Sequence, residues 1–540
     1  MLINGIELRL ANAPHIELIE EIKKLIIQSN QLNIRIGKLE EDNKKLRDEN
    51  ERLKKEITKI KRLNEKPKIQ PSILEQKSQS GENKKRSNNK QSKLSKLKID
   101  RTEKIYIPKD QLPVGAIFKG FKRKIVQELI SKVEITEYLL AQYELSDGKY
   151  IFAKEPESIQ GWSFGPELRS HIVYQSFKNR VPQQKIVDEL TDKGIQISEG
   201  EINRIIEQTN EQLQKEKDEL LNAGLQTKQI QVDDTGGRHK GKNGYSTVIC
   251  NDFFTYIKTT YSKSRINFLE ILRGNHSDYI VTQETIDYLN QYNFGSKIDL
   301  LKDLIGKQFI NLKELDVFIQ KNLYSKKHRQ AIIEGALIGS LITHGFDPKT
   351  VIISDDAGQF NLFIHALCWI HIERSLKKLV PLNEIDSREI EEIRNDFWNY
   401  YQKLKDYKTN PLPEMKEFLL NEFDRIFTKY PTELPLSLIL QSIRKNKKEM
   451  LIVLEYPKTP LHNNLSEINL REMVIKRKIS AGTKSDKGRE ARDTFISLNK
   501  TCQKLDVSFW EYLNDRLAKK NEIPYLPDMV LDKYKQSLSP

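Results

Sequence analysis

Two pairs of aspartates and one glutamate are the candidate catalytic or metal-binding residues of this sequence. Asp233 and Asp234 close the apolar segment QIQV, Asp355 and Asp356 close VIIS, and Glu467 follows Asn464 in a segment with helical periodicity. Acids at strand ends can converge at one edge of a sheet. Clustered carboxylates repel one another and need a cation, and all-oxygen ligand sets select Mg²⁺ or Mn²⁺. Two such ions support phosphodiester cleavage. Taken alone, the same pattern also fits aspartates that cap turns.

The segments around these acids predict an α/β domain with much helix. Helical patterns dominate residues 266–348 and 385–450, and NLFIHALCWIHIERSLKKL, after the second aspartate pair, also predicts a helix. The loop GGRHKGKNG is expected to join the first two of three strands, and a polar turn at Asn251-Asp252 the second and third. Alternation and β-branched residues place these strands at 229–234, 245–251 and 254–260.

A heptad repeat occupies the N-terminal segment, 1–65. Ile22, Ile36 and Ile57 occupy the second seam position, where Ser29, Asn43 and Asn50 also fall. Leucine at one seam position with isoleucine at the other favours a parallel two-stranded coiled coil, and a homodimer is expected. A long helix docked on the protein's own body is the alternative. The repeating residues are Leu18, Leu25, Leu32, Leu39, Leu46, Leu53 and Ile60.

Three further segments complete the expected organisation. Residues 66–100 are polar, basic and too poor in apolar groups to fold alone, so they predict a disordered tether, with or without a grip on DNA phosphates. A mixed, mainly helical DNA-binding domain is expected over 101–228, and a C-terminal tail over 506–540. Within the former, TEKIYIP and KYIFAKE predict strands. Helices are predicted at 164–180, 182–194 and 198–221, the last two resembling a helix-turn-helix.

Composition favours a polyanionic partner. The 540 residues carry a formal net charge of +14, with 37% apolar and 31% charged residues. No stretch approaches the roughly 20 apolar residues of a membrane span, and the N-terminus lacks the pattern of a signal peptide. Three widely spaced cysteines form no disulfide framework and fit a reducing cytoplasm.

Three blocks of this sequence resemble those of DDE transposases of the insertion-sequence sixty-six family. They are QVDDTGGR, then SDDAGQFN with LCWIHIERSLKKL, and NNLSEINLREMVIKRKISAGTKSDKG. The last block is the most specific, because many spaced residues match at once. The coiled coil, the basic tether and the PELRSHIVYQSF helix occur in the same order as in that family, so the resemblance covers most of residues 15–515.

The resemblance implies a ribonuclease H-like catalytic core over 229–505, split by helical insertions at about 280–345 and 385–450. It also implies Asp233, Asp355 and Glu467 as catalytic ligands of Mg²⁺ or Mn²⁺. Asp234 stands where the family has Glu, and Asp356 where Gly is commoner, so each neighbouring aspartate stays open as the ligand. The interval between the two aspartates is longer than expected. No cysteine occurs over about 136–160, and no zinc-binding module is therefore expected.

Two sets of side chains are expected near the acids. Cys368, Trp369, His371 and Arg374 form a Cys-Trp-x-His-x-x-Arg helix, interpreted as packing or site-positioning rather than as half of a zinc site. A basic set is expected to hold DNA phosphates, with a solvated basic helix as the alternative. Its members are Arg471, Lys476, Arg477, Lys478, Lys263 and Arg265.

These features together predict a bacterial insertion-sequence transposase that cleaves DNA strands and transfers the 3′ hydroxyl end into target DNA. Its partners are then the transposon ends and the target DNA. A cytoplasmic protein is expected, associated with the nucleoid when bound to DNA and not with a membrane. A catalytically inactive or domesticated DNA-binding relative and a coiled-coil DNA-associated regulator are the alternatives.

Overall fold

The computed structural model describes residues 98–538 except 114, 130 and 433, together with six isolated helical positions between 37 and 52. The chain divides into two compact units, Met1–Ile130 and Ser131–Pro540. The heptad leucines and nearly all of the basic tether lie outside the described residues, so the coiled coil and the disordered tether stay predictions. No helix in the described part of the chain is long and apolar enough to cross a membrane.

In the first unit, the described residues form a short 3₁₀ helix, η1 (Lys109–Gln111), besides the six helical positions between 37 and 52. The strand expected at TEKIYIP is wrong, because residues 102–108 are exposed and pair with no strand. The second strand prediction is confirmed in its centre. There β1 (Gln142–Glu144) and β2 (Tyr150–Phe152) form an exposed antiparallel hairpin in the second unit.

A five-stranded mixed sheet is the centre of the second unit. Its strand order is β5-β4-β3-β8-β9. β3, β4 and β5 run antiparallel to one another, whereas β3 with β8 and β8 with β9 are parallel. Ile230, Val248, Ile257 and Ile352 are fully buried, which ties the sheet to the hydrophobic core. The strands are β3 (Gln229–His239), β4 (Lys242–Cys250), β5 (Thr255–Thr260), β8 (Val351–Ser354) and β9 (Ile364–Leu367).

The three predicted strands are present, but the loop expected at GGRHKGKNG is wrong. β3 and β4 continue through it as a hairpin that turns at Lys240-Gly241, where φ is 49° and 72°. Two consecutive positive φ angles suit the tight turn whose twist matches that of the strands. Thr483 then pairs with the hairpin end, since its carbonyl accepts from the Lys240 amide at 2.9 Å and its amide donates to the Arg238 carbonyl at 3.1 Å. The predicted turn at Asn251-Asp252 is confirmed.

The free edge of β5 is covered by one stripe of polar side chains on α19 (Asp486–Lys504). An edge strand leaves a row of amides without partners. Here three of those amides donate to side chains spaced every fourth residue along α19, which therefore lies along the strand. The pairs are Thr255 with Thr501, Ile257 with Ser497, and Thr259 with Asp493.

The helices α5, α6 and α7, which precede the sheet, pack together with α20 and α21, the last two helices of the described chain. α7 contacts α19 and α21, and α5 contacts α20. Ser198 caps α7 as predicted, by accepting from the Glu201 amide. The tail expected over 506–540 is instead helical, because its apolar side chains Leu513, Leu526 and Val530 join the main core. The helices are α5 (Pro166–Phe177), α6 (Gln183–Asp192), α7 (Glu199–Leu225), α20 (Phe509–Leu517) and α21 (Leu526–Leu538).

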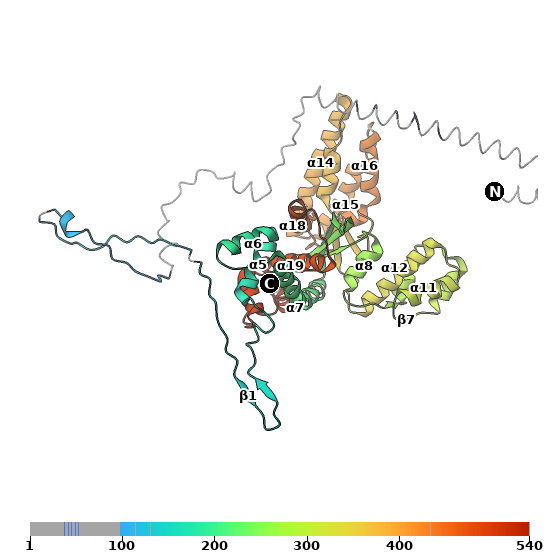
Figure 1. Ribbon diagram of the computed structural model, residues 1–540. Coiled ribbons are helices and arrows are strands. Elements are labelled where there is room, and N and C mark those ends of the chain that lie inside the picture. The colour runs from blue at the N-terminus through green and yellow to red at the C-terminus, as the bar shows by residue number, and fades with distance from the viewer. Residues whose placement is uncertain are drawn as a thin grey trace, which may run out of the picture. The chain divides into compact units, whose positions relative to one another are not determined.

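One helical stretch lies between β5 and β8, and a second follows β9. That they are insertions into a catalytic domain stays a prediction. In the first stretch, α8 and α12 contact each other and contribute buried side chains to the main core, and they lie together with α11 in Figure 1. This stretch comprises α8 (Arg265–Arg273), β6 (Tyr279–Ile280), α9 (Gln283–Leu289), η2 (Gly295–Ile298), α10 (Asp299–Lys302), β7 (Gln308–Phe309), α11 (Leu312–Lys321) and α12 (Lys326–Thr343).

The second helical stretch has a hydrophobic core of its own, centred on Trp369, Phe397, Tyr400 and Phe427. Figure 1 shows α14, α15 and α16 standing side by side as a projection from the sheet. The chain then returns to the sheet through α18. The elements are α13 (Trp369–Lys377), α14 (Glu384–Thr409), α15 (Pro413–Phe427), α16 (Leu434–Lys445), α17 (Lys447–Met450), η3 (Ile452–Leu454) and α18 (Asn464–Ser480).

Candidate active site

The register between β3 and β8 brings the first two predicted acids together. Gln229 pairs with Val351, and Gln231 with Ile353. Continued by two residues, this register sets Asp233 beside Asp355, which immediately follows β8. Neighbouring strands lie about 4.8 Å apart, and paired residues of parallel strands present their side chains on the same face. The two carboxylates therefore belong to one face of the sheet, at adjacent strands.

Glu467 reaches the same place from the first turn of α18. The start of this helix is bonded to β3, because the Asn463 side-chain amide donates to the Val232 carbonyl at 2.8 Å. The Leu465 amide also donates to Gln231 Oε1 at 3.2 Å. Since Gln231 and Asp233 are two residues apart on a strand, they share a face. α18 thus lies over the face of β3 that carries Asp233.

The electrostatics of Asp233 reflect this convergence. The pKa of its carboxyl is raised to about 7, first by burial, against a hydrogen bond from the Asp234 amide that lowers it and with the nearby negative charges included. The negative charges of Asp355 and Glu467 contribute to this rise. Among the described residues, however, the oxygens of these three acids do not form a group that lies entirely within 4.8 Å. The three carboxylates therefore interact through space without being packed into one ligand shell.

The two neighbouring aspartates have protein partners of their own. Asp234 accepts from the Gln359 side-chain amide at 2.8 Å and lies 4.0 Å from Lys263 Nζ. Asp356 lies 3.5 Å from the Asn446 side-chain amide and is exposed. Burial raises the pKa of Asp234, with Lys263 and Gln359 opposing the shift. The pKa of Asp233 is affected by the charges of both Asp355 and Glu467, so Asp233 is a better candidate than Asp234 for the third acid. Its catalytic role stays a prediction.

Glu467 is held by the helix expected to support the site. Arg374 binds its carboxylate with two hydrogen bonds, Nη1 to Oε1 at 2.7 Å and Nη2 to Oε2 at 2.9 Å. His371 Nε2 lies 3.4 Å from the same Oε1. A paired fork of this kind fixes orientation as well as charge. Sequence reasoning placed both residues near the site but did not identify Glu467 as their partner.

Cys368 and Trp369 anchor that helix. The Cys368 sulfur accepts from the Asn463 amide at 3.2 Å, and the Trp369 amide donates to the Leu461 carbonyl at 3.0 Å. The Trp369 ring is 1% exposed and donates through Nε1 to the Met450 carbonyl at 3.0 Å. Burial raises the pKa of the Cys368 thiol. Both residues therefore tie α13 to the segment before α18 and to the second core.

The predicted phosphate-binding residues divide into two groups. Arg471 and Lys478 are exposed on α18. Lys476 points inward, donating to the Ser176 carbonyl at 2.9 Å, and burial lowers its pKa to about 8. Arg265 bonds the Tyr288 hydroxyl at 2.9 Å and the Gly358 carbonyl at 2.6 Å. Lys476 and Arg265 thus hold the fold together in this structure, whereas Lys263 lies beside Asp234.

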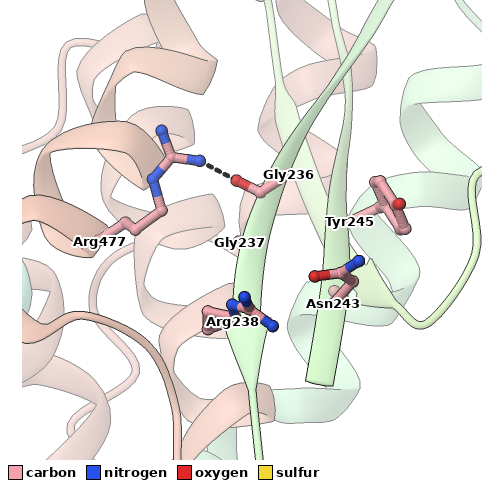
Figure 2. A pocket seen from close by; sticks show the side chains of 7 residues that line it. Gly236, Gly237, Arg238, Asn243, Tyr245 and Arg477 are labelled. Carbon is pink, nitrogen blue, oxygen red and sulfur yellow. Dashed lines mark hydrogen bonds between the residues drawn. The ribbon is translucent and has the colours of Figure 1, made fainter. Parts of the chain in front are cut away.

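Arg477 lines an open pocket of about 380 Å³ at the β3–β4 hairpin. Its guanidinium donates to the Gly236 carbonyl, as Figure 2 shows, and the Arg238 side chain lies at the other end of the labelled group. Because three of the lining residues are glycines, the backbone of both strands is accessible. The lining residues are Gly236, Gly237, Arg238, Asn243, Gly244, Tyr245 and Arg477.

The α6–α7 pair, predicted to read DNA, has the expected turn at Gly194 with φ of 86°. Its basic side chains are engaged with acids of the same helices. Lys185 pairs with Asp188 at 2.9 Å, and Arg204 is bonded to Glu201. A DNA-reading role for this pair therefore stays a prediction.

Comparison with known proteins bears on most of the second unit. The model of the Transposase IS66 family matches residues 161–282 and 311–491, a span that contains all three acids, α13 and α18. The chain is also 40% identical over 316 residues to the "Uncharacterized protein y4jO" of Sinorhizobium fredii (strain NBRC 101917 / NGR234). That alignment covers 55% of this chain and 95% of the relative. No solved structure matches. The chain belongs to the IS66 family of transposases.

Proposed function

We propose that this transposase cleaves DNA strands at the ends of its insertion sequence and transfers the 3′ hydroxyl to target DNA, with Asp233, Asp355 and Glu467 as the catalytic acids. The observation that carries the proposal is the placement of these acids. β3–β8 register sets the two aspartates side by side, and the charge of Glu467 reaches Asp233 from α18. Perturbed carboxylates gathered from distant segments are typical of active sites.

The proposed catalytic fold is ribonuclease H-like. Its support is the order of the sheet, an antiparallel meander of three strands extended beside its first strand by two parallel ones. In this arrangement β3 is the central strand, and its acid, Asp233, lies beside the end of β8, the fourth strand along the chain. The two helical stretches then enter as insertions before β8 and after β9.

The donor set fits hard divalent cations. Three carboxylates supply only oxygen ligands, and their mutual repulsion is relieved by positive charge, so Asp233, Asp355 and Glu467 would hold Mg²⁺ or Mn²⁺. Such ions would activate water or a sugar hydroxyl and stabilise the leaving oxygen. Arg374 and His371 would orient Glu467 toward the ions. Gln359 and Lys263 bind the Asp234 carboxylate, which keeps it apart from the three ligands.

DNA would approach along the exposed basic groups near this edge of the sheet. Arg471 and Lys478 lie on α18, and Arg477 lines the hairpin pocket. The overall charge of +14 supports a phosphate-dominated affinity. Lys476 and Arg265 are left out of the proposed surface because the protein itself occupies them.

We also propose that two chains act together in the bacterial cytoplasm, at the nucleoid. The heptad repeat over 1–65 supports this, since two transposon ends require two protomers. Sedimentation of the full chain should show a dimer, and proline at Leu32 and Leu39 should give monomers. A wild-type chain that is monomeric at high micromolar concentration contradicts the dimer.

The test of the proposed reaction is a cleavage and strand-joining assay with Mg²⁺ on DNA that carries the element's own ends. The two alternative functions, an inactive or domesticated DNA-binding relative and a coiled-coil DNA-associated regulator, predict binding without cleavage. The favourable contacts of Glu467 with Arg374 and His371 argue for a maintained site over an inactive relative.

A further inference from the structure

A second group of ligand-type side chains lies in the first helical stretch. His276 and Asp278 fall in the segment between α8 and β6, and His344 caps the end of α12. Their ligand atoms all lie within 4.8 Å of one another. In the part of the chain that the structure describes, no other group of three or more His, Cys, Asp or Glu residues is so close. The group is therefore distinct from the predicted catalytic acids.

The Asp278 carboxylate is buried and fixed by hydrogen bonds from neighbouring side chains, as metal-binding carboxylates commonly are. The residue is 7% exposed, and it accepts from Ser340 Oγ at 2.8 Å and from the Gln308 side-chain amide at 2.7 Å.

The two imidazoles complete the group. His344 Nε2 lies 2.9 and 3.1 Å from the two Asp278 oxygens, and the His276 ring stacks on His344 with centroids 3.5 Å apart. Ligands bound at 2.0–2.2 Å to a tetrahedral ion lie about 3.3–3.5 Å apart. The His344 Nε2 to Asp278 distances of 2.9 and 3.1 Å are hydrogen-bond distances slightly below that value, so the ion would take the place of this hydrogen bond. The exposed His276 ring would turn out of its stack on His344 to direct a nitrogen lone pair at the ion.

We propose that His276, Asp278 and His344 bind one Zn²⁺ ion, with water in the fourth position. Two imidazoles and one carboxylate suit this borderline-soft cation, whereas Mg²⁺ prefers the all-oxygen set of the predicted catalytic acids. The nearby Arg273 guanidinium donates to the Asp278 backbone carbonyl, so it is not bonded to the carboxylate itself.

The ion would fasten the base of a stretch that the IS66 family model does not match, residues 283–310. β6 directly follows Asp278, and it pairs with β7, where Ile280 meets Gln308. Gln308 also holds Asp278. His344 lies at the far end of α12, so the three ligands join the entrance of this stretch to the helix on which it packs.

Zinc binding by the full chain tests the proposal. After removal of metal with a chelator, Zn²⁺ is titrated against a chromogenic indicator, and thermal unfolding is followed with and without Zn²⁺. The wild type should bind at this group and gain melting temperature. His276→Ala should weaken zinc binding at least about 100-fold and abolish the thermal gain. This side chain is exposed and its recorded contact is the stacked ring, so the fold should survive; His276→Gln is the size-matched second variant.

His328→Ala is the matched control, because its half-buried ring also stacks on an aromatic ring, that of Phe294, and lies outside any ligand group. It should bind Zn²⁺ as the wild type does. Asp355→Ala should do so too, which separates this site from the catalytic proposal. The inference is overturned if the His276 variants retain wild-type affinity, if the wild type shows no zinc binding above them, or if Asp355→Ala alone removes it.

Discussion

Replacing Arg374 with alanine removes both hydrogen bonds that hold the Glu467 carboxylate. We predict that the variant needs more Mg²⁺ for DNA cleavage and cleaves more slowly, because Glu467 then samples many orientations. A carboxylate has lone pairs left over after binding one guanidinium, so Arg374 and a cation can share it. Arg374 is in this view a positioning residue that acts through Glu467.

The expected magnitudes differ between stability and function. The side chains of Arg374 and Glu467 are 46% and 27% exposed, so solvent screens the pair and its loss should cost about 1 kcal/mol or less of unfolding free energy. Outer-shell partners of metal ligands typically change metal affinity or activity by about 10–100-fold. A large functional loss with small destabilisation is therefore expected.

The assay is cleavage of labelled DNA ends over a Mg²⁺ titration, with urea unfolding in parallel. Arg374→Lys keeps the charge without the fork and should fall between the wild type and Arg374→Ala. Arg388→Ala, which removes an exposed pair with Glu384 on α14, is the matched control and should change neither measurement. If Arg374→Ala reaches half-maximal cleavage at a lower Mg²⁺ concentration than the wild type, Arg374 competes with the cation and the reasoning is refuted.

Two further predictions concern the hairpin and the DNA surface. Gly482→Ala should lower the free energy of unfolding by about 1–3 kcal/mol in urea, because an added Cβ would lie 2.4 Å from the Arg238 carbonyl oxygen. Arg471→Gln should weaken DNA binding uniformly across sequences. It should reduce the slope of log affinity against log salt by about 0.9, the value for one phosphate contact.

Each of these has a control on the same protein. Gly358→Ala, where an added Cβ meets nothing within 4 Å, should leave stability unchanged. Equal destabilisation by both alanines would remove the close approach as the cause. For DNA binding, Arg388→Gln should keep the wild-type salt slope. An Arg471→Gln protein with that same slope would exclude a phosphate contact at this position.

Local periodicity made much of the fold predictable. The helical pattern and the Ser198 cap located α7, and β-branched alternation located β3, β4 and β5. The hairpin end was missed because its glycines and charged residues resemble a loop, and only the pairing of Thr483 with Lys240 shows why it stays extended. The C-terminal helices were missed because a short segment gains its partners from α5 and α7, which lie far away in sequence.

The residues of the candidate site could be predicted from the sequence, but the contacts between their side chains could not. The acids were recognisable because each was predicted at the end of a strand or the start of a helix. The resemblance to the family indicated that they belong to one site. Which aspartate of each pair faces Glu467 depends on the β3–β8 register, a tertiary property. The inward turn of Lys476 toward Ser176 likewise depends on α5, and no pattern within α18 distinguishes it from exposed Lys478.

The central claim is that Asp233, Asp355 and Glu467 together perform Mg²⁺-dependent DNA cleavage. The most direct measurement is the cleavage and strand-joining activity of the three single alanine variants and of Asp234→Ala, on DNA with the element's ends. We predict that each of the three loses detectable cleavage while DNA binding is kept, and that Asp234→Ala retains activity. Wild-type cleavage by any one of the three variants would contradict the account.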